Sequence, residues 1–138
     1  KANKIDTIII DGPPGIGCPL ISAIGGVNHA IVVTEPTLSG LHDLKRTIET
    51  CNKFEIPISV IVNKYNLNNE LTIELEKYCN SIDIKVIGKI PFDKEIINAM
   101  LNRQSILEYA PESQVSLILK NIWKDFFEKE KSTNHNKN

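Results

Sequence analysis

Short apolar runs that alternate with stretches of helical spacing are the feature that most constrains the fold of this chain. Four runs are rich in β-branched side chains and too short for helices, and they cover residues 5–10, 30–34, 58–62 and 85–90. Such runs are typical of strands that are buried on both faces, as they are inside parallel sheets. We therefore predict an α/β fold in which helices cover both faces of a parallel sheet.

Between these runs, apolar residues recur every three or four positions, which predicts amphipathic helices. The apolar positions of the four predicted helices are Leu41, Leu44, Ile48 and Cys51; then Leu71, Leu75 and Tyr78; then Ile96, Ile97 and Met100; and finally Val115, Ile118, Leu119, Ile122 and Phe126. The predicted N-caps are Ser39, Asn68 or Asn69, and Asp93, and the segment 111–113 opens the last helix, which runs to about Phe127.

Composition narrows the class of protein. The 138 residues carry 16 Lys and Arg against 17 Asp and Glu, so the formal net charge is -1 and no basic nucleic-acid groove or anionic-membrane patch is expected. No apolar run approaches the roughly 20 residues that span a bilayer. Three widely spaced cysteines favour a reducing, cytoplasmic setting over a disulfide framework. We expect one domain over residues 1–129 and a disordered tail over 130–138.

The ends of the predicted strands hold the candidate functional residues, because open parallel sheets bind ligands beyond their carboxyl ends. The first strand ends in Asp11, and a loop dense in Gly and Pro follows over residues 12–19. Glycine amides in such a loop can donate to phosphate oxygens, and the Asp11 carboxylate can hold Mg²⁺. The alternative is a strand-ending turn in which Asp11 caps a helix.

The other three strand ends carry further polar residues. Glu35 follows the second run and either faces a ligand or belongs to a plain loop, and nearby His42 is more typical of a solvated helix face. Asn63 and Lys64 follow the third run, and an Asn amide suits the edge of a purine base because it both donates and accepts. Asp93 is either a simple N-cap or part of a base pocket with the preceding residues 91–92.

Four segments, taken in order and spacing, resemble the MinD/ParA-type P-loop ATPases. They read IIDGPPGIGCP, VVTEPTLSGLHDLKR, NKYNLN and GKIPFD, and the resemblance runs from about Ile5 to Trp123. Within that family the chain is most similar to the subfamily that carries an inserted ferredoxin-like domain with iron–sulfur clusters. The resemblance implies a deviant Walker-type ATPase that binds Mg·ATP and forms a homodimer with nucleotide sandwiched between the subunits.

The resemblance also implies roles for individual residues. Asp11 resembles the Walker B acidic residue near Mg²⁺, and Asn63 resembles the strand-end Asn that reads adenine. The segment that senses the γ-phosphate is matched by Pro13, Pro14 and Gly15, and the segment that flanks the base is matched by Pro91 and Asp93.

Two family features are missing from this sequence. It has no G-x-x-x-x-G-K-[ST] phosphate loop and no C-x-x-C-x-x-C cluster motif. We expect both to lie before Lys1, so that the chain is the C-terminal portion of such an ATPase. In the family the missing first strand lies in mid-sheet, beside the strand that ends in Asp11. The isolated chain should therefore expose apolar surface, bind ATP weakly or not at all, and be inactive.

Cys18 lies seven residues after Asp11, an offset that resembles the switch-region cysteine of the nitrogenase iron protein. By that resemblance Cys18 is a candidate ligand of a [4Fe–4S] cluster at the dimer interface. The alternative is a small buried residue that packs the loop, and this is a common role for free cysteine. Cys51 and Cys79 fall at helical positions that indicate structural roles.

Two further classes of function stay open. A GTPase is one, because Asn63-Lys64-Tyr65 is similar to the start of the N-K-x-D guanine signature, but position 66 is Asn and the switch reads D-G-P-P-G. The other is a non-catalytic interaction module that only pairs with a partner. Sequence before Lys1 would separate this module from an ATPase, because only the ATPase needs the phosphate loop.

Overall fold

A computed structural model describes residues 7–128 and contains one parallel sheet of three strands. The strands are β1 (Ala30–Thr34), β2 (Ile58–Asn63) and β3 (Lys85–Ile90), in the order β1-β2-β3. The helices are α1 (Cys18–Ile24), α2 (Leu38–Lys53), α3 (Asn69–Ser81), α4 (Lys94–Leu101), α5 (Ile106–Tyr109) and α6 (Gln114–Trp123), with a 3-10 turn η1 (Tyr65–Leu67) and a π-helical turn η2 (Lys124–Glu128). The predicted α/β class is confirmed.

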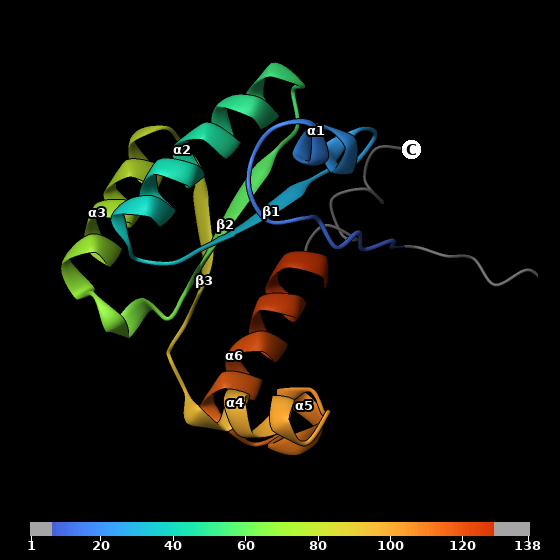
Figure 1. Ribbon diagram of the computed structural model, residues 1–138, viewed down its shortest axis with the longest axis vertical. Coiled ribbons are helices and arrows are strands. Elements are labelled where there is room, and N and C mark those ends of the chain that lie inside the picture. Colours follow the sequence, from blue (N-terminus) through green and yellow to red (C-terminus); the bar gives the residue numbers. More distant parts are fainter. Residues whose placement is uncertain (1–6, 129–138) are drawn as a thin grey trace, which may run out of the picture.

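Helices cover both faces of the sheet, with α2 and α3 on one side and α6 on the other (Figure 1). Val60 and Val62 of β2 point toward α2 and α3, where they form a buried core with Leu44 and Leu75. On the opposite face α6 lies so close to β3 that a Cβ added at Gly88 would overlap Ile122. The absence of a side chain at position 88 therefore lets α6 dock against the strand.

The helix starts follow the predicted chemistry with one exception. Asn68 accepts from the backbone N–H of Leu71, and Asp93 accepts from that of Glu95, so both predicted N-caps are confirmed. The predicted cap Ser39 is wrong, because Thr37 holds that position and accepts from the N–H of Gly40 at 2.9 Å. The helices α1 and α5 are not anticipated by the sequence pattern, since both are too short for a clear apolar period.

A second, smaller core forms where α4, α5 and α6 meet beyond the end of β3. Ala99, Ile106 and Val115 are buried together there. The Ser116 hydroxyl is buried beside them and donates to the carbonyl oxygens of Ile106 and Ala110. These hydrogen bonds hold α5 against the start of α6 and extend the fold past the sheet.

The predicted strand at residues 5–10 is wrong in its described part, because residues 7–10 form no strand. Ile8, Ile9 and Ile10 are instead exposed, at 77%, 67% and 58% of their surface. A strand needs a neighbour for its backbone hydrogen bonds, and β1 pairs only with β2 in the described part of the chain. An apolar run without a partner strand therefore stays outside the sheet.

The outer strand β1 leaves apolar surface open on the face away from α2. Val33 is 61% exposed and Ile31 is 36% exposed, whereas Ile122 of α6 packs against Gly88 of β3 on that face. This is the kind of surface that the family resemblance implies for the isolated chain. Within residues 7–128 no helix is long and apolar enough to cross a membrane. The predicted tail over residues 130–138 lies outside the described residues.

Candidate functional site

The carboxyl ends of the three strands are joined to one another by side chains. Lys64, just after β2, forms an ion pair with Glu35, just after β1, with 2.7 Å between Nζ and Oε1. Asn66, one turn further along, accepts from the backbone N–H of Phe92 at the end of β3, at 2.7 Å. The first contact connects the ends of β1 and β2, and the second connects the ends of β2 and β3. Side-chain contacts therefore hold the whole carboxyl edge of the sheet together.

The turn after β1 is compact and leaves no space for a side chain at Gly40. Glu35 accepts the N–H of Thr37 through its carbonyl oxygen at 2.8 Å, and buried Thr34 donates its hydroxyl to the carbonyl oxygen of Gly40 at 3.1 Å. A Cβ at position 40 would overlap the Glu35 carbonyl oxygen. These contacts hold the backbone of Glu35 firmly, so the position from which its side chain extends is fixed.

The end of β2 combines a polar side chain with an unusual backbone conformation. Lys64 adopts the left-handed region, at φ 53° and ψ 37°, which residues with a Cβ seldom occupy. In this conformation its backbone N–H donates to Oδ1 of Asn63 at 3.0 Å. Asn63 follows the fully buried Val62, so its half-buried amide sits at the rim of the core.

At the end of β3, one predicted site residue serves the fold. Asp93 accepts from the backbone N–H of Glu95 through Oδ1 at 2.9 Å, which is the plain N-cap role that its sequence context allows. Pro91 is buried, while Phe92 beside it is 39% exposed. The structure thus places Pro91 and Asp93 next to the Asn66 contact, with the Phe92 ring available as an apolar wall.

The Gly-Pro loop after residue 10 lies apart from these strand ends. Asp11, Pro13, Pro14 and Gly15 are all exposed, and Gly15 has a φ of +89°. A Cβ at Gly12 would lie 3.9 Å from Cβ of Ala23, in the last turn of α1. That turn packs near Ile56, which precedes β2, so the loop begins near the amino ends of the strands. The magnesium role of Asp11 stays a prediction.

The cysteines do not come together in the described part of the chain. Cys18 is exposed at the first residue of α1, whereas Cys51 and Cys79 are fully buried in different core clusters. Burial raises the pKa of the Cys51 and Cys79 thiols, so both favour the protonated form, which is a poor metal ligand. Among residues 7–128, no group of three or more His, Cys, Asp or Glu side chains has the geometry of a metal site.

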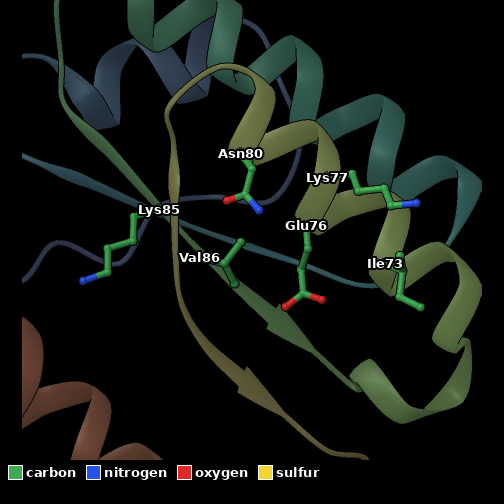
Figure 2. A pocket seen from close by; sticks show the side chains of 6 residues that line it. All are labelled: Ile73, Glu76, Lys77, Asn80, Lys85 and Val86. Atoms are coloured by element: carbon green, nitrogen blue, oxygen red, sulfur yellow. The ribbon is translucent and has the colours of Figure 1, made fainter.

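An open hollow lies elsewhere, between the end of α3 and the start of β3 (Figure 2). Its volume is about 440 Å³ and it opens widely to solvent. Figure 2 shows the ammonium groups of Lys77 and Lys85 pointing away from each other. His42 is exposed on α2 beside Asp43. Neither feature has the make-up of a binding site.

Two residues of the carboxyl edge were not given these roles by sequence reasoning. Asn66 accepts from the backbone of Phe92, 26 positions further along the chain, and no local sequence pattern predicts a contact between residues so far apart. Gly40 follows the N-cap Thr37 by three residues, and that spacing alone does not reveal the nearby carbonyl oxygen that excludes a side chain. Both depend on where neighbouring strands end, which only the tertiary structure specifies.

Comparisons with known proteins agree with this architecture. A family model described as "ParA: NUBPL iron-transfer P-loop NTPase" matches residues 1–127. An uncharacterised protein of Methanocaldococcus jannaschii is 36% identical over 123 residues, which is 89% of this chain and 40% of that protein. The septum site-determining protein MinD of Bacillus subtilis is 29% identical over 124 residues, which is 86% of this chain and 46% of that protein.

A solved structure gives the same result for the fold. The septum site-determining protein MinD complexed with Mg-ADP, from Pyrococcus horikoshii, matches with a TM-score of 0.71 and 27% identity, covering 83% of this chain and 47% of that chain. This chain thus spans less than half the length of these relatives. Because the family model covers almost all of the sequence, the chain belongs to the ParA family of P-loop NTPases and has the fold of its MinD-like nucleotide-binding domain.

Proposed function

We propose that this chain is part of an ATP-binding and ATP-hydrolysing module, with the adenine base at the joined carboxyl ends of the strands. The observation that carries the proposal is Asn63, which ends the buried strand β2 between the Glu35–Lys64 and Asn66–Phe92 contacts. An amide fixed at the rim of a core can recognise the edge of a purine, and the exposed Phe92 ring offers it an apolar wall.

The phosphate-binding half of the site comes, in this proposal, from polypeptide outside the 138 residues. The sequence lacks a phosphate loop, and the chain spans less than half of its relatives. A further strand between β1 and residues 5–10 would pair with the edge of β1 and carry Asp11 to the carboxyl edge, and polypeptide packed on that face would cover Ile31 and Val33. The resemblance to ATPases with a strand at that place, and the exposure of both apolar segments, support this step.

Asp11 is the residue that would hold Mg²⁺ once it lies at that edge. It offers one exposed carboxylate, and this fits an ion that takes most of its ligands from phosphate oxygens and water. Bound there, the ion supplies charge neutralisation for phosphoryl transfer to water. Pro14 and Gly15 would follow the γ-phosphate through backbone contacts, and Asn63 with Lys64, Pro91 and Asp93 would define the base end.

Calorimetry tests the proposal by comparing the 138-residue chain with the longer polypeptide that contains it. The longer polypeptide should bind Mg·ATP and hydrolyse it, while the isolated chain should bind at least roughly 100-fold more weakly because it lacks the charge-stabilising phosphate loop. Asp11→Asn in the longer polypeptide should slow hydrolysis by roughly 100-fold or more with binding largely kept. Asp83→Asn is the matched control, at an exposed turn after α3, and should change neither.

Micromolar binding of Mg·ATP by the isolated chain would contradict the division of the site between two segments. Equal affinity for GTP in the longer polypeptide would instead favour a GTPase. The Asn66 contact speaks against that alternative, because the side chain at the position of the guanine-binding carboxylate already accepts the N–H of Phe92. Failure to bind any nucleotide would favour a pairing module, for which the open edge of β1 is the specific support.

We also propose that the ATPase serves iron–sulfur chemistry as a homodimer, with a ferredoxin-like domain in the preceding polypeptide. The matching family model is described as an iron-transfer NTPase, and Cys18 is exposed at the start of α1. Since a [4Fe–4S] cluster is held by four ligands, Cys18 would need thiolates from a second subunit or from chain outside residues 7–128. The exposure of the Cys18 loop makes it accessible for such sharing.

Anaerobic reconstitution of the longer polypeptide distinguishes a cluster bound at Cys18 from clusters bound only in the ferredoxin-like domain. Wild-type protein should bind iron and sulfide, and Cys18→Ala should lower the iron content and the visible absorption if Cys18 is a ligand. Ser39→Ala, at an exposed position of α2, is the control and should leave both unchanged. An unchanged iron content in Cys18→Ala would end the ligand role of Cys18, and no cluster in any variant would end the iron–sulfur proposal.

A further inference from the structure

Glu35 and Lys64 form a contact that the proposed nucleotide site does not by itself require. The carboxylate of Glu35 lies 2.7 Å from Nζ of Lys64, although both side chains are about two-fifths exposed, at 42% and 39%. An exposed ion pair adds little to global stability. The tight turn after β1 holds the backbone of Glu35 in place, so the ion pair can restrain the Lys64 side chain.

The backbone of Lys64 is the part of this contact that bears on Asn63. A left-handed conformation is unfavourable for a residue with a Cβ, so it persists where the surroundings hold it. The conformation directs the Lys64 N–H to Oδ1 of Asn63 at 3.0 Å. Releasing the Lys64 side chain removes one of the restraints on that turn and so weakens the hydrogen bond.

The same hydrogen bond decides which end of the Asn63 amide faces outward. A backbone N–H can only donate, so the atom opposite it must be the amide oxygen, and the assignment of oxygen and nitrogen follows. The NH₂ group is then the end left for a ligand. A donor at this place fits a base with an acceptor ring nitrogen, and it repels a base with an N–H there.

We infer that Glu35 is a positioning residue: through Lys64 it holds the Asn63 amide with its NH₂ group outward, and so biases the site toward bases that accept a hydrogen bond. The inference rests on the proposed function for its ligand, but the positioning itself is a property of the chain without nucleotide. It gives the loop after β1 a part in base selectivity without any contact to the base.

Hydrogen exchange measured by NMR on the 138-residue chain tests the positioning. Glu35→Gln keeps the shape of the side chain and removes its charge, and it should speed exchange of the Lys64 amide roughly 5-fold, because local opening becomes easier. Glu76→Gln is a matched control, since it breaks a comparable exposed pair with Lys89 at 2.9 Å. It should leave the Lys64 amide unchanged. Both variants should unfold in urea near the wild-type midpoint.

The ratio of ATP to GTP affinity, measured on the longer polypeptide, tests the consequence. Glu35→Gln should lower that ratio roughly 5-fold, and Glu35→Asp should retain part of it. Lys64→Met should match Glu35→Gln, and the double variant should add no further loss, because both act through one pair. Glu76→Gln should keep the wild-type ratio.

The outcomes separate this inference from the proposed function. Unchanged exchange of the Lys64 amide in Glu35→Gln would overturn the positioning role, whatever nucleotide binds. Faster exchange with an unchanged nucleotide ratio would overturn the link to selectivity. If the wild-type longer polypeptide binds neither nucleotide, the proposed function fails and the selectivity claim falls with it, while the exchange result still decides the positioning.

Discussion

The two faces of the sheet differ sharply in how completely they are covered. Toward α2 and α3, the side chains of Val60, Val62 and Leu75 have no exposed surface at all. On the opposite face, Val33 of β1 is 61% exposed, whereas Gly88 of β3 lies directly under Ile122 of α6. We call the face toward α2 and α3 the finished face, because its core is fully buried, and the opposite face, where β1 is exposed, the open face. Exposed apolar side chains that lie together on a sheet face are typical of a surface where another polypeptide packs.

The two edges of the sheet repeat the contrast. β3 carries Lys85 and Lys89 and has an irregular register opposite Val60 and Ile61, two features that discourage a further strand from pairing. β1 reads Ala-Ile-Val-Val-Thr and carries neither charge nor irregularity. The edge at β3 is thus protected in the manner of a true sheet edge, whereas the edge at β1 is suited to receive a strand.

The finished face should be sensitive to loss of volume, and this is the largest effect we expect. Leu75→Ala removes a fully buried side chain of α3 from the main core, which should lower the free energy of unfolding by about 2–5 kcal/mol. Urea denaturation measures it. Ile73→Ala, on the same helix but 50% exposed, should change stability by less than about 0.5 kcal/mol. Equal losses would mean that α3 is not docked as described.

The covered end of the other face depends on Gly88. Gly88→Ala places a methyl group where Ile122 now lies, so it should destabilise the fold by about 1–3 kcal/mol through overpacking. A Gly88→Ala/Ile122→Ala double variant should lose less stability than the sum of the losses of the two single variants, because the second change makes room for the first. Full additivity in urea denaturation would show that α6 does not rest on β3.

The same substitution on the two faces compares them directly. Val62→Thr puts a hydroxyl into the finished core and should lower the free energy of unfolding by about 1–3 kcal/mol. Val33→Thr makes the identical change on the open face and should stay within about 0.5 kcal/mol of wild type. Thermal and urea unfolding measure both. A large loss for Val33→Thr would indicate that the isolated chain already covers this face.

The smallest effect concerns the short helix α5, outside both faces. The carboxylate of Glu108 accepts from the backbone N–H and the hydroxyl of Ser105, at 3.0 and 2.8 Å, which lowers its pKa. A depressed pKa in the folded state adds stability above the unfolded pKa that is lost as the pH falls. The stability difference between wild type and Glu108→Gln should therefore shrink between about pH 6 and pH 3.

Urea midpoints at several pH values measure this difference. Glu112→Gln provides the control, because that carboxylate is 87% exposed and lies 3.9 Å from its nearest cation, Lys120. Its difference from wild type should stay nearly constant over the same range. A constant difference for Glu108→Gln as well would show that the capping box does not hold in solution.

Local patterns in the sequence determined much of the fold. The runs at 30–34, 58–62 and 85–90 became strands, and the apolar spacing around Leu44 and Leu75 became the helices of the finished face, because both periods reflect which side of an element is buried. The caps Asn68 and Asp93 follow from side chains that reach their own backbone. The positions of the candidate binding residues at the strand ends, Asn63 and Lys64 among them, were likewise predicted from the sequence.

Only the tertiary structure decided what depends on distant neighbours. The run at 5–10 has the composition of a strand, yet residues 7–10 stay outside the sheet, because pairing is a property of two segments and not of one. The Glu35–Lys64 ion pair and the Asn66–Phe92 hydrogen bond join residues 29 and 26 positions apart. Local sequence patterns therefore specified most of the helices and strands, whereas tertiary contacts decided whether the run at 5–10 joins the sheet and how the side chains at the strand ends combine, since contact free energy depends on spatial proximity.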